Sequence, residues 1–345
     1  MTNVTLVGID IAKTVFQLHA VNNKGECVFK KRLKREQLLS EISKLPACTI
    51  AMEACGTSQY WGRTFSTSGH QVKLISPQFV KPFVKTNKND KNDAAAIVEA
   101  ASRPSMHFVS IKSESKQVAQ AIHRRRSLLV KQRTAAANHI RGILAEFGIC
   151  IPQKITSLTK KLVELLDASL HPQFNLKLKL ICQDVYDEIK ELNAKIKLYD
   201  GEIKEMVLAN PEIKKIMELE GVGPISATMA WIAIGDDPSV YKNGRQFSAS
   251  VGLVPSQHSS GNKISLGRIS KRGDRYLRQL LIHGARAIVC RAKKDDKPVY
   301  NWIRELIARR GFNIAVVAVA NKSARKIWAT LANYKSQQGL EAVAA

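Results

Sequence analysis

Apolar runs that end on a carboxylate are the feature of this sequence that most constrains its fold. Residues 4–9 form such a run and end on Asp10, and residues 49–52 form another and end at Glu53. Residues 15–21, 27–33 and 72–75 are further strand-like segments, and turn-forming residues stand at 22–25. Helical spacing appears at residues 37–45, 59–65 and 94–101. The first hundred residues therefore predict an α/β domain.

The order of these segments predicts how the two carboxylates are arranged. Three strands, followed by helix, strand, helix, strand and helix, is the order of a ribonuclease H-like fold. In that fold the first and fourth strands are neighbours in the sheet, so Asp10 and Glu53 are expected to lie side by side.

A second pair of acids stands at residues 87–101, where a polar segment leads into a helical run. Asp90 and Asp93 are three residues apart, so on a helix they share one face. Four carboxylates at one point repel each other unless a cation offsets their charge, so Asp10, Glu53, Asp90 and Asp93 predict a site for one or two Mg²⁺ ions. Each acid also has an ordinary explanation: Asp93 as a helix N-cap, Asp10 as a turn cap and Glu53 as a strand-end charge.

The charge of the chain indicates its class of partner. The 345 residues carry a formal net charge of +25, which favours binding to polyanions such as nucleic acids. No apolar run approaches the roughly 20 residues that span a bilayer, and the N-terminus lacks a signal-peptide pattern, so no membrane partner is expected. The six cysteines form no CxxC pair, which speaks against a zinc knuckle or a disulfide framework and fits a reducing cytoplasm.

The middle of the chain, residues 109–210, reads as a helical stalk. Residues 113–147 predict one long helix, and its basic residues are candidates for contact with nucleic acid: Arg124, Arg125, Arg126, Lys131 and Arg133. From Val185 to Met206, apolar residues alternate spacings of four and three, which is a heptad seam typical of a coiled coil. The alternative is a helical hairpin, in which this seam packs against residues 113–147 of the same chain.

The remaining residues, 211–345, predict a mainly helical domain with two loops suited to phosphate. Gly221 and Gly223 in GVGP match the turn of a helix-hairpin-helix and would let the backbone approach a phosphate, although a plain interhelical turn has the same pattern. Further on, a serine-rich loop precedes a cluster of cations that could activate a serine and stabilise a phosphorane: Arg268, Lys271, Arg272, Arg275 and Arg278.

Taken together, these motifs resemble the IS110/IS1111 family of insertion-sequence transposases. The resemblance rests on Asp10 in GIDIAK, Glu53 in MEACG, DKNDA, GVGP, GLVP followed by SG, and ISKRGDRYLR, and it covers nearly the whole chain. It implies a RuvC-like domain at residues 1–108 with a DEDD metal site, a stalk at 109–210, and a transposase domain at 211–345. The family's nucleophilic serine falls on Ser260, although Ser259 duplicates the residue one position earlier.

The resemblance also implies partners and a mechanism. Family members act on donor and target DNA, are guided by a structured non-coding bridge RNA, and work as dimers that pair into tetramers. A serine–phosphodiester intermediate would conserve bond energy for rejoining, with Mg²⁺ polarising the phosphate. Two other functions fit the same residues: a RuvC-like junction endonuclease that uses water, and a non-catalytic nucleic-acid scaffold.

Overall fold

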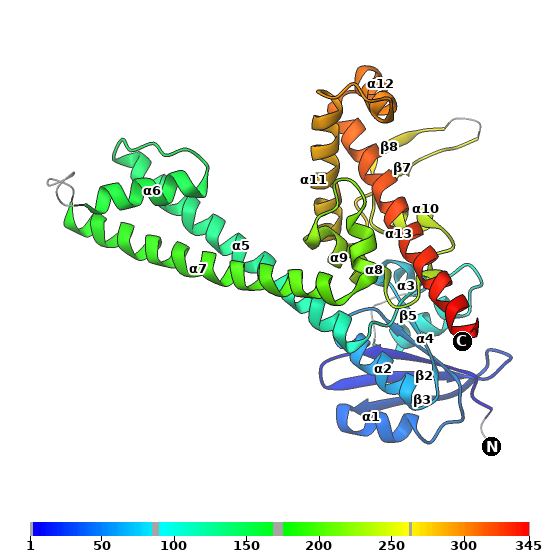
Figure 1. Ribbon diagram of the computed structural model, residues 1–345. Coiled ribbons are helices and arrows are strands. Elements are labelled where there is room, and N and C mark those ends of the chain that lie inside the picture. Colours follow the sequence, from blue (N-terminus) through cyan, green and yellow to red (C-terminus); the bar gives the residue numbers. More distant parts are fainter. Residues whose placement is uncertain (1–2, 85–89, 168–174, 262–263, 345) are drawn as a thin grey trace. The chain divides into compact units, whose positions relative to one another are not determined.

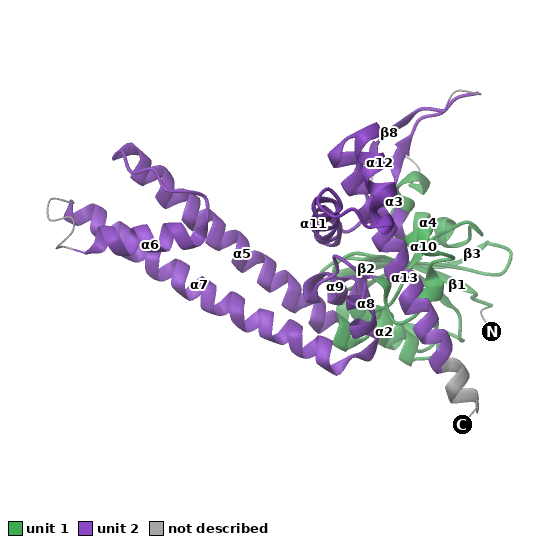
Figure 2. Ribbon diagram, turned by 45° about the horizontal axis from the view of Figure 1, so that its top comes forward, with its two compact units in different colours: residues 1–116, 234–247 green, residues 117–233, 248–345 purple. Residues whose placement is uncertain are grey.

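The computed structural model describes residues 3–84, 90–167, 175–261 and 264–344. The chain forms two compact units (Figure 2). Unit 1 contains residues 1–116 and 234–247, and unit 2 contains residues 117–233 and 248–345. The predicted boundaries at residues 108 and 210 stay a prediction.

Unit 1 is built on a six-stranded mixed sheet (Figure 1). Its order is β3-β2-β1-β4-β5-β6, in which β1 pairs antiparallel with β2 and parallel with β4. The expectation that the first and fourth strands are neighbours is therefore confirmed. The strands are β1 (Leu6–Ile11), β2 (Val15–Val21), β3 (Cys27–Lys34), β4 (Thr49–Glu53), β5 (Gln71–Ile75) and β6 (Phe108–Val109). The short edge strand β6 was not predicted, since two residues carry no periodicity.

Helices cover both faces of this sheet because its central strands are apolar on both sides. Helices α1 (Arg35–Ile42) and α2 (Ser58–Thr67) bury Leu38 and Phe65 in one core with Ile9 and Ile50. Helix α4 (Asp90–Ala101) lies on the opposite face, where Ile97 packs in a second core that includes Ala51. Two short helices, α3 (Pro77–Val80) and η1 (Lys81–Phe83), precede α4.

A distant segment, residues 234–247, completes unit 1. The buried Lys116 ammonium donates to the Gly235 carbonyl and forms an ion pair with Asp236 at 3.1 Å. The Ser113 backbone N–H also donates to Asp236, at 3.0 Å. This segment contains η2 (Pro238–Val240) and the start of α10 (Gly244–Ser250). Asp236 therefore fixes the place where the chain returns to unit 1.

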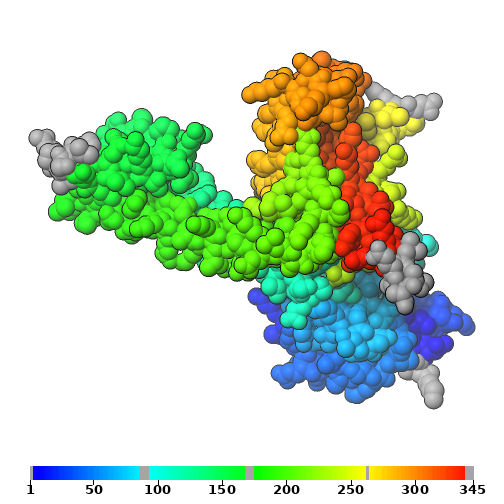
Figure 3. All heavy atoms as spheres, viewed as in Figure 1, coloured from blue at the N-terminus to red at the C-terminus, as the bar shows by residue number. Residues whose placement is uncertain are grey.

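The first part of unit 2 is a helical arm. Helix α5 (Glu114–Glu146) confirms the predicted long helix, and α6 (Ile155–Leu166) and α7 (Leu176–Ala209) follow it. Side chains of α6 and α7 form a continuous outer surface on the arm (Figure 3).

The predicted heptad seam lies on α7 and is buried within the chain. Val185 and Ile189 pack in one core with Ile140 of α5 and Leu162 of α6. Leu192 and Ile196 pack with Leu129 of α5. The seam thus forms the intramolecular hairpin that the sequence left open, and a coiled coil between chains is not confirmed.

The rest of unit 2 is mainly helical. Helices α8 (Pro211–Met217) and α9 (Pro224–Ile234) flank the GVGP turn, and α11 (Arg275–Ala292) packs along α13 (Phe312–Ala344). Short elements η3 (Pro298–Tyr300) and α12 (Asn301–Arg310) connect α11 to α13. An antiparallel hairpin of β7 (Pro255–Gln257) and β8 (Leu266–Ile269) carries the serine-rich loop.

In the described parts of the chain, no helix is both long enough and apolar enough to cross a membrane. All six cysteines are free thiols, in keeping with the prediction of no disulfide framework.

Candidate active site

Asp10 and Glu53 lie side by side at the carboxyl ends of two neighbouring parallel strands, β1 and β4. The register of β1 with β4 pairs Gly8 with Ala51 and Ile9 with Met52, and the two acids are the next residues of these two strands. Because side chains alternate along a strand, Asp10 shares a face with Gly8, and Glu53 shares that face with Ala51. Both acids are half-buried.

The pKa of the Cys55 thiol reflects this placement. Partial desolvation, followed by the negative charges of Glu53 and Asp10, raises the pKa of Cys55 above its ordinary value. A thiol that feels both carboxylates lies near both of them, so the two acids are neighbours in space as well as in register.

Helix α4 lies against the same face at Gly8. A Cβ atom on Gly8 would come within 2.5 Å of the Ala94 carbonyl oxygen and 2.6 Å of the Val98 Cγ2 atom. Only a residue without a side chain allows so close an approach. Asp93, half-buried in the first turn of α4, immediately precedes Ala94. The helix that carries the second predicted acid pair therefore crosses the strand that carries Asp10.

The four predicted acids are brought together only in part. Asp90 is the first residue of α4, and its side chain lies outside the described part of the structure. Among the described residues, no group of three or more His, Cys, Asp or Glu side chains is close enough to hold a metal ion. Carboxylate oxygens are nevertheless the donors that hard divalent cations prefer, so the chemistry of Asp10, Glu53 and Asp93 fits such an ion.

The two adjacent serines of the β7–β8 hairpin have different surroundings. The Ser259 hydroxyl oxygen accepts hydrogen bonds from the Gln257 side-chain amide (2.9 Å) and the Ser265 backbone N–H (3.3 Å). Ser259 therefore braces the loop. Ser260 is exposed beside Gly261, which adopts a positive φ of 55°.

The GLVP and KRGD segments, which are separate in sequence, interlock at the base of the hairpin. A Cβ on Gly273 would lie 1.8 Å from the Ser250 carbonyl oxygen, so these backbones touch. Arg278 is only 8% exposed, and its Nη1 donates to the carbonyls of Val251 (2.9 Å) and Arg272 (2.8 Å). This arginine holds the loop together, and its predicted contact with nucleic acid remains untested.

The other cations of this region are solvent-exposed. They are Arg268 on β8, Lys271 and Arg272 in the following loop, and Arg275 at the start of α11.

The basic residues of α5 fall into two groups. Arg126 forms an ion pair with Asp200 of α7, with 2.6 Å between Nε and Oδ1, and Arg133 donates to Asn193 of α7 at 2.8 Å. These two arginines therefore join α5 to α7 within the arm. Arg124, Arg125 and Lys131 are exposed.

The GVGP turn packs on α11. A Cβ on Gly221 would lie 2.8 Å from the Gly284 carbonyl oxygen, and the φ of Gly221 is +76°. This close packing is sufficient to explain why residue 221 is a glycine, without any bound phosphate. At Gly223 a Cβ would meet open space, and phosphate binding there remains a prediction.

No sequence motif pointed to His123 and Tyr276, whose rings lie 6.0 Å apart beside a cavity of unit 2. They stand on α5 and α11, 153 positions apart by their residue numbers. No local motif could have joined them.

Comparisons with known proteins agree with these motifs. A family described as "Transposase", of the DEDD IS110 type, matches residues 7–149, and the "Transposase IS116/IS110/IS902 family" matches residues 213–301. A "Probable family 20 transposase" of Pseudomonas aeruginosa is 45% identical over 95% of this chain and 97% of its own length. The "Transposase for insertion sequence element IS1111A" of Coxiella burnetii is 43% identical over 96% of this chain and 90% of its own. The corresponding protein of IS1328 from Yersinia enterocolitica is 39% identical over 95% and 97%. The chain therefore belongs to the IS110/IS1111 family of insertion-sequence transposases.

Proposed function

We propose that this transposase cuts and rejoins DNA through a covalent bond between Ser260 and a DNA phosphate. The observation that carries this proposal is the contrast between the two adjacent serines. Both serines are exposed, and the Ser259 hydroxyl is engaged in hydrogen bonds within the hairpin, whereas Ser260 stands next to it on the same loop. Exposed cations follow on β8 and in the loop after it.

In this reaction the Ser260 hydroxyl attacks phosphorus, and the Oγ–P bond forms as the bond from phosphorus to the DNA 3′ oxygen breaks. The serine proton leaves with a base, and the departing 3′ oxygen takes up a proton. Reversal by another 3′-hydroxyl releases the serine and joins the strands without an external energy source. Exposed Arg272 and Arg275 are suited to stabilise the extra negative charge on the phosphate during both steps.

We further propose that Asp10, Glu53, Asp90 and Asp93 hold Mg²⁺. When bound, this ion would polarise a phosphate and stabilise a leaving oxygen. The shared sheet edge of Asp10 and Glu53, the position of Asp93 and the hard character of carboxylate donors support this assignment. The structured guide RNA, donor and target DNA, and dimer-to-tetramer assembly are likewise proposed as partners and states of this chain.

The test compares two neighbouring serine variants. Wild-type protein, Ser260→Ala and Ser259→Ala are mixed with labelled element DNA and the element's transcribed non-coding end, and the products are separated on denaturing gels. We expect the labelled DNA to remain bound to wild-type protein, and no such adduct with Ser260→Ala despite unchanged binding. Ser259→Ala should retain the adduct at a reduced level, since its hydroxyl braces the loop.

An adduct that persists in Ser260→Ala and disappears in Ser259→Ala would move the nucleophile by one residue. Efficient cleavage by the wild type without any adduct would instead support a nuclease that uses water.

A further inference from the structure

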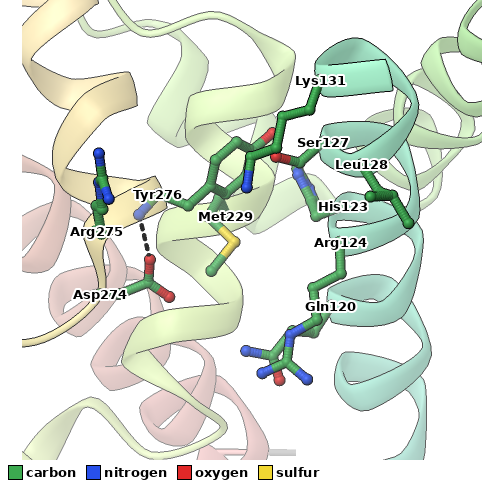
Figure 4. Close-up of a pocket in the computed structure, with 10 residues that line it drawn as sticks. All are labelled: Gln120, His123, Arg124, Ser127, Leu128, Lys131, Met229, Asp274, Arg275 and Tyr276. Carbon is green, nitrogen blue, oxygen red and sulfur yellow. Dashed lines mark hydrogen bonds between the residues drawn. The ribbon is translucent and has the colours of Figure 1, made fainter. Parts of the chain in front are cut away.

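A cavity of about 390 Å³ opens in unit 2 (Figure 4). Its walls come from one face of α5, from Met229 of α9 and from the first residues of α11. This volume falls within the range of pockets that hold small organic ligands.

The rim of the cavity is cationic. Arg124 and Lys131 stand two turns apart on α5, and Arg275 lines the cavity from α11; all three side chains are exposed. The acid in the lining, Asp274, accepts hydrogen bonds from the backbone N–H groups of Tyr276 (2.8 Å) and Leu277 (2.9 Å) as the N-cap of α11. The lining thus contains three cationic side chains and one carboxylate, which is already hydrogen-bonded to backbone N–H groups. This excess of positive charge favours an anionic ligand.

The inner wall is aromatic and apolar. The rings of His123 and Tyr276 meet edge to face, with an interplanar angle of 64°, and the buried Met229 side chain lies beside Tyr276. Aromatic rings and a thioether provide favourable contacts for a flat π-system. The ligand that matches both regions has an anionic group attached to a flat ring.

His123 adds an unused hydrogen-bond acceptor to this wall. The side chain is 1% exposed, and its Nε2 lies 2.8 Å from the Thr228 hydroxyl oxygen. That hydroxyl donates its proton to the Pro224 carbonyl at 2.7 Å, so it accepts from His123, and the histidine proton resides on Nε2. Nδ1 then presents a lone pair, and it has no hydrogen-bond partner among the described residues. This nitrogen is a buried acceptor in the wall behind the cavity.

We propose that this cavity binds one unstacked nucleotide of a bound nucleic-acid strand. Arg124 and Lys131 contact the phosphate, and the base lies against Tyr276 and Met229. The proposal rests on the nucleic-acid binding of the proposed function, and it adds a site that reads a single nucleotide.

The experiment measures binding of free nucleotides to the full-length protein by equilibrium dialysis. The probes are 5′-AMP, 5′-dAMP, adenosine and ribose 5-phosphate. We expect saturable binding of at least one nucleotide, and at least about tenfold weaker binding of adenosine and of ribose 5-phosphate, since each lacks half of the recognised chemistry.

Two neighbouring arginines provide a matched pair of variants. Arg124→Ala removes a charge from the rim and should weaken nucleotide binding about tenfold, as expected for a charge-assisted hydrogen bond. Arg125→Ala removes the same charge from an exposed position outside the lining and should change binding less than about twofold. A third variant, Ser127→Phe, places a ring in the cavity and should abolish binding.

The comparison of AMP with dAMP shows whether the strand that the cavity binds is RNA or DNA. Tighter binding of AMP assigns the cavity to RNA, and equal or tighter binding of dAMP shows that it admits DNA. The proposal is overturned if no probe binds saturably up to about 10 mM, if ribose 5-phosphate binds as well as AMP, or if the two arginine variants behave alike. Because dialysis involves no cleavage, its outcome is independent of the serine adduct. An adduct without nucleotide binding removes only the cavity proposal, and the reverse result removes only the proposed chemistry.

Discussion

Replacing Gly8 by alanine tests whether the approach of α4 to β1 positions the candidate metal site. The added Cβ would lie 2.5 Å from the Ala94 carbonyl oxygen, whereas ordinary van der Waals contact begins at 3.4 Å, so the backbones must separate by about 0.9 Å. Overpacking of this kind destabilises a protein by about 1–3 kcal/mol. A displacement near 1 Å in a catalytic arrangement costs about 100-fold in rate. Because Asp93 precedes Ala94, we expect Gly8→Ala to lower cleavage by about that factor.

Strand cleavage is measured at a temperature where far-UV circular dichroism shows both proteins fully folded, and unfolding in guanidinium gives the change in stability. Gly142→Ala, on α5, is the control, because a Cβ there meets open space and alanine favours a helix. It should retain activity and be equal to or more stable than the wild type. A Gly8→Ala protein that loses stability but cleaves at the wild-type rate would refute the positioning argument.

Three further predictions concern the two strand-borne carboxylates, the helical arm and His123. Asp10→Asn and Glu53→Gln should each abolish cleavage while circular dichroism stays unchanged, since each removes an anionic ligand at constant volume; cleavage by the wild type in EDTA would contradict the metal assignment. Ile196→Asp should destabilise the arm by about 3 kcal/mol or more in urea unfolding, because it buries a charge at a position that is 5% exposed, whereas Leu198→Asp, at 61% exposure, should be nearly neutral. Burial, and then the nearby charge of Arg126, lower the pKa of His123 to about 4, with Asp274 acting in the opposite direction. Between pH 6.5 and 4 the unfolded chain therefore binds the extra proton, and the free energy of unfolding should fall by up to about 3 kcal/mol as pH decreases, a slope that His123→Gln should remove.

The strands of unit 1 could be predicted closely because their signals are local. Apolar runs and turn residues indicated β2 and β4 nearly to the residue, and their order placed Asp10 beside Glu53. The strand β6 could not be predicted because it consists of only two residues, which are held in the sheet by pairing with β5. The return of residues 234–247 to unit 1 could not be predicted either, since the Lys116–Asp236 ion pair joins residues 120 positions apart by number.

The sequence could not decide what the heptad seam packs against. A 4-3 spacing specifies that one face of α7 is buried, but a second chain and α5 of the same chain present equally suitable apolar surfaces. The role of the basic residues on α5 was ambiguous for a similar reason. Arg124, Arg125 and Arg126 are consecutive, and only the third meets a carboxylate on α7. Which arginine faces a partner depends on helix rotation and on residues more than 70 positions away.

The return of residues 234–247 has a consequence for how this protein can be divided. A fragment that ends at residue 116 lacks the partners that Lys116 and Ser113 find in Gly235 and Asp236, and it leaves a buried ammonium without its carboxylate. The first unit is therefore not encoded by one continuous stretch of gene. Chimaeras between related elements should therefore fold only when the two stretches supply matching partners for the buried ammonium.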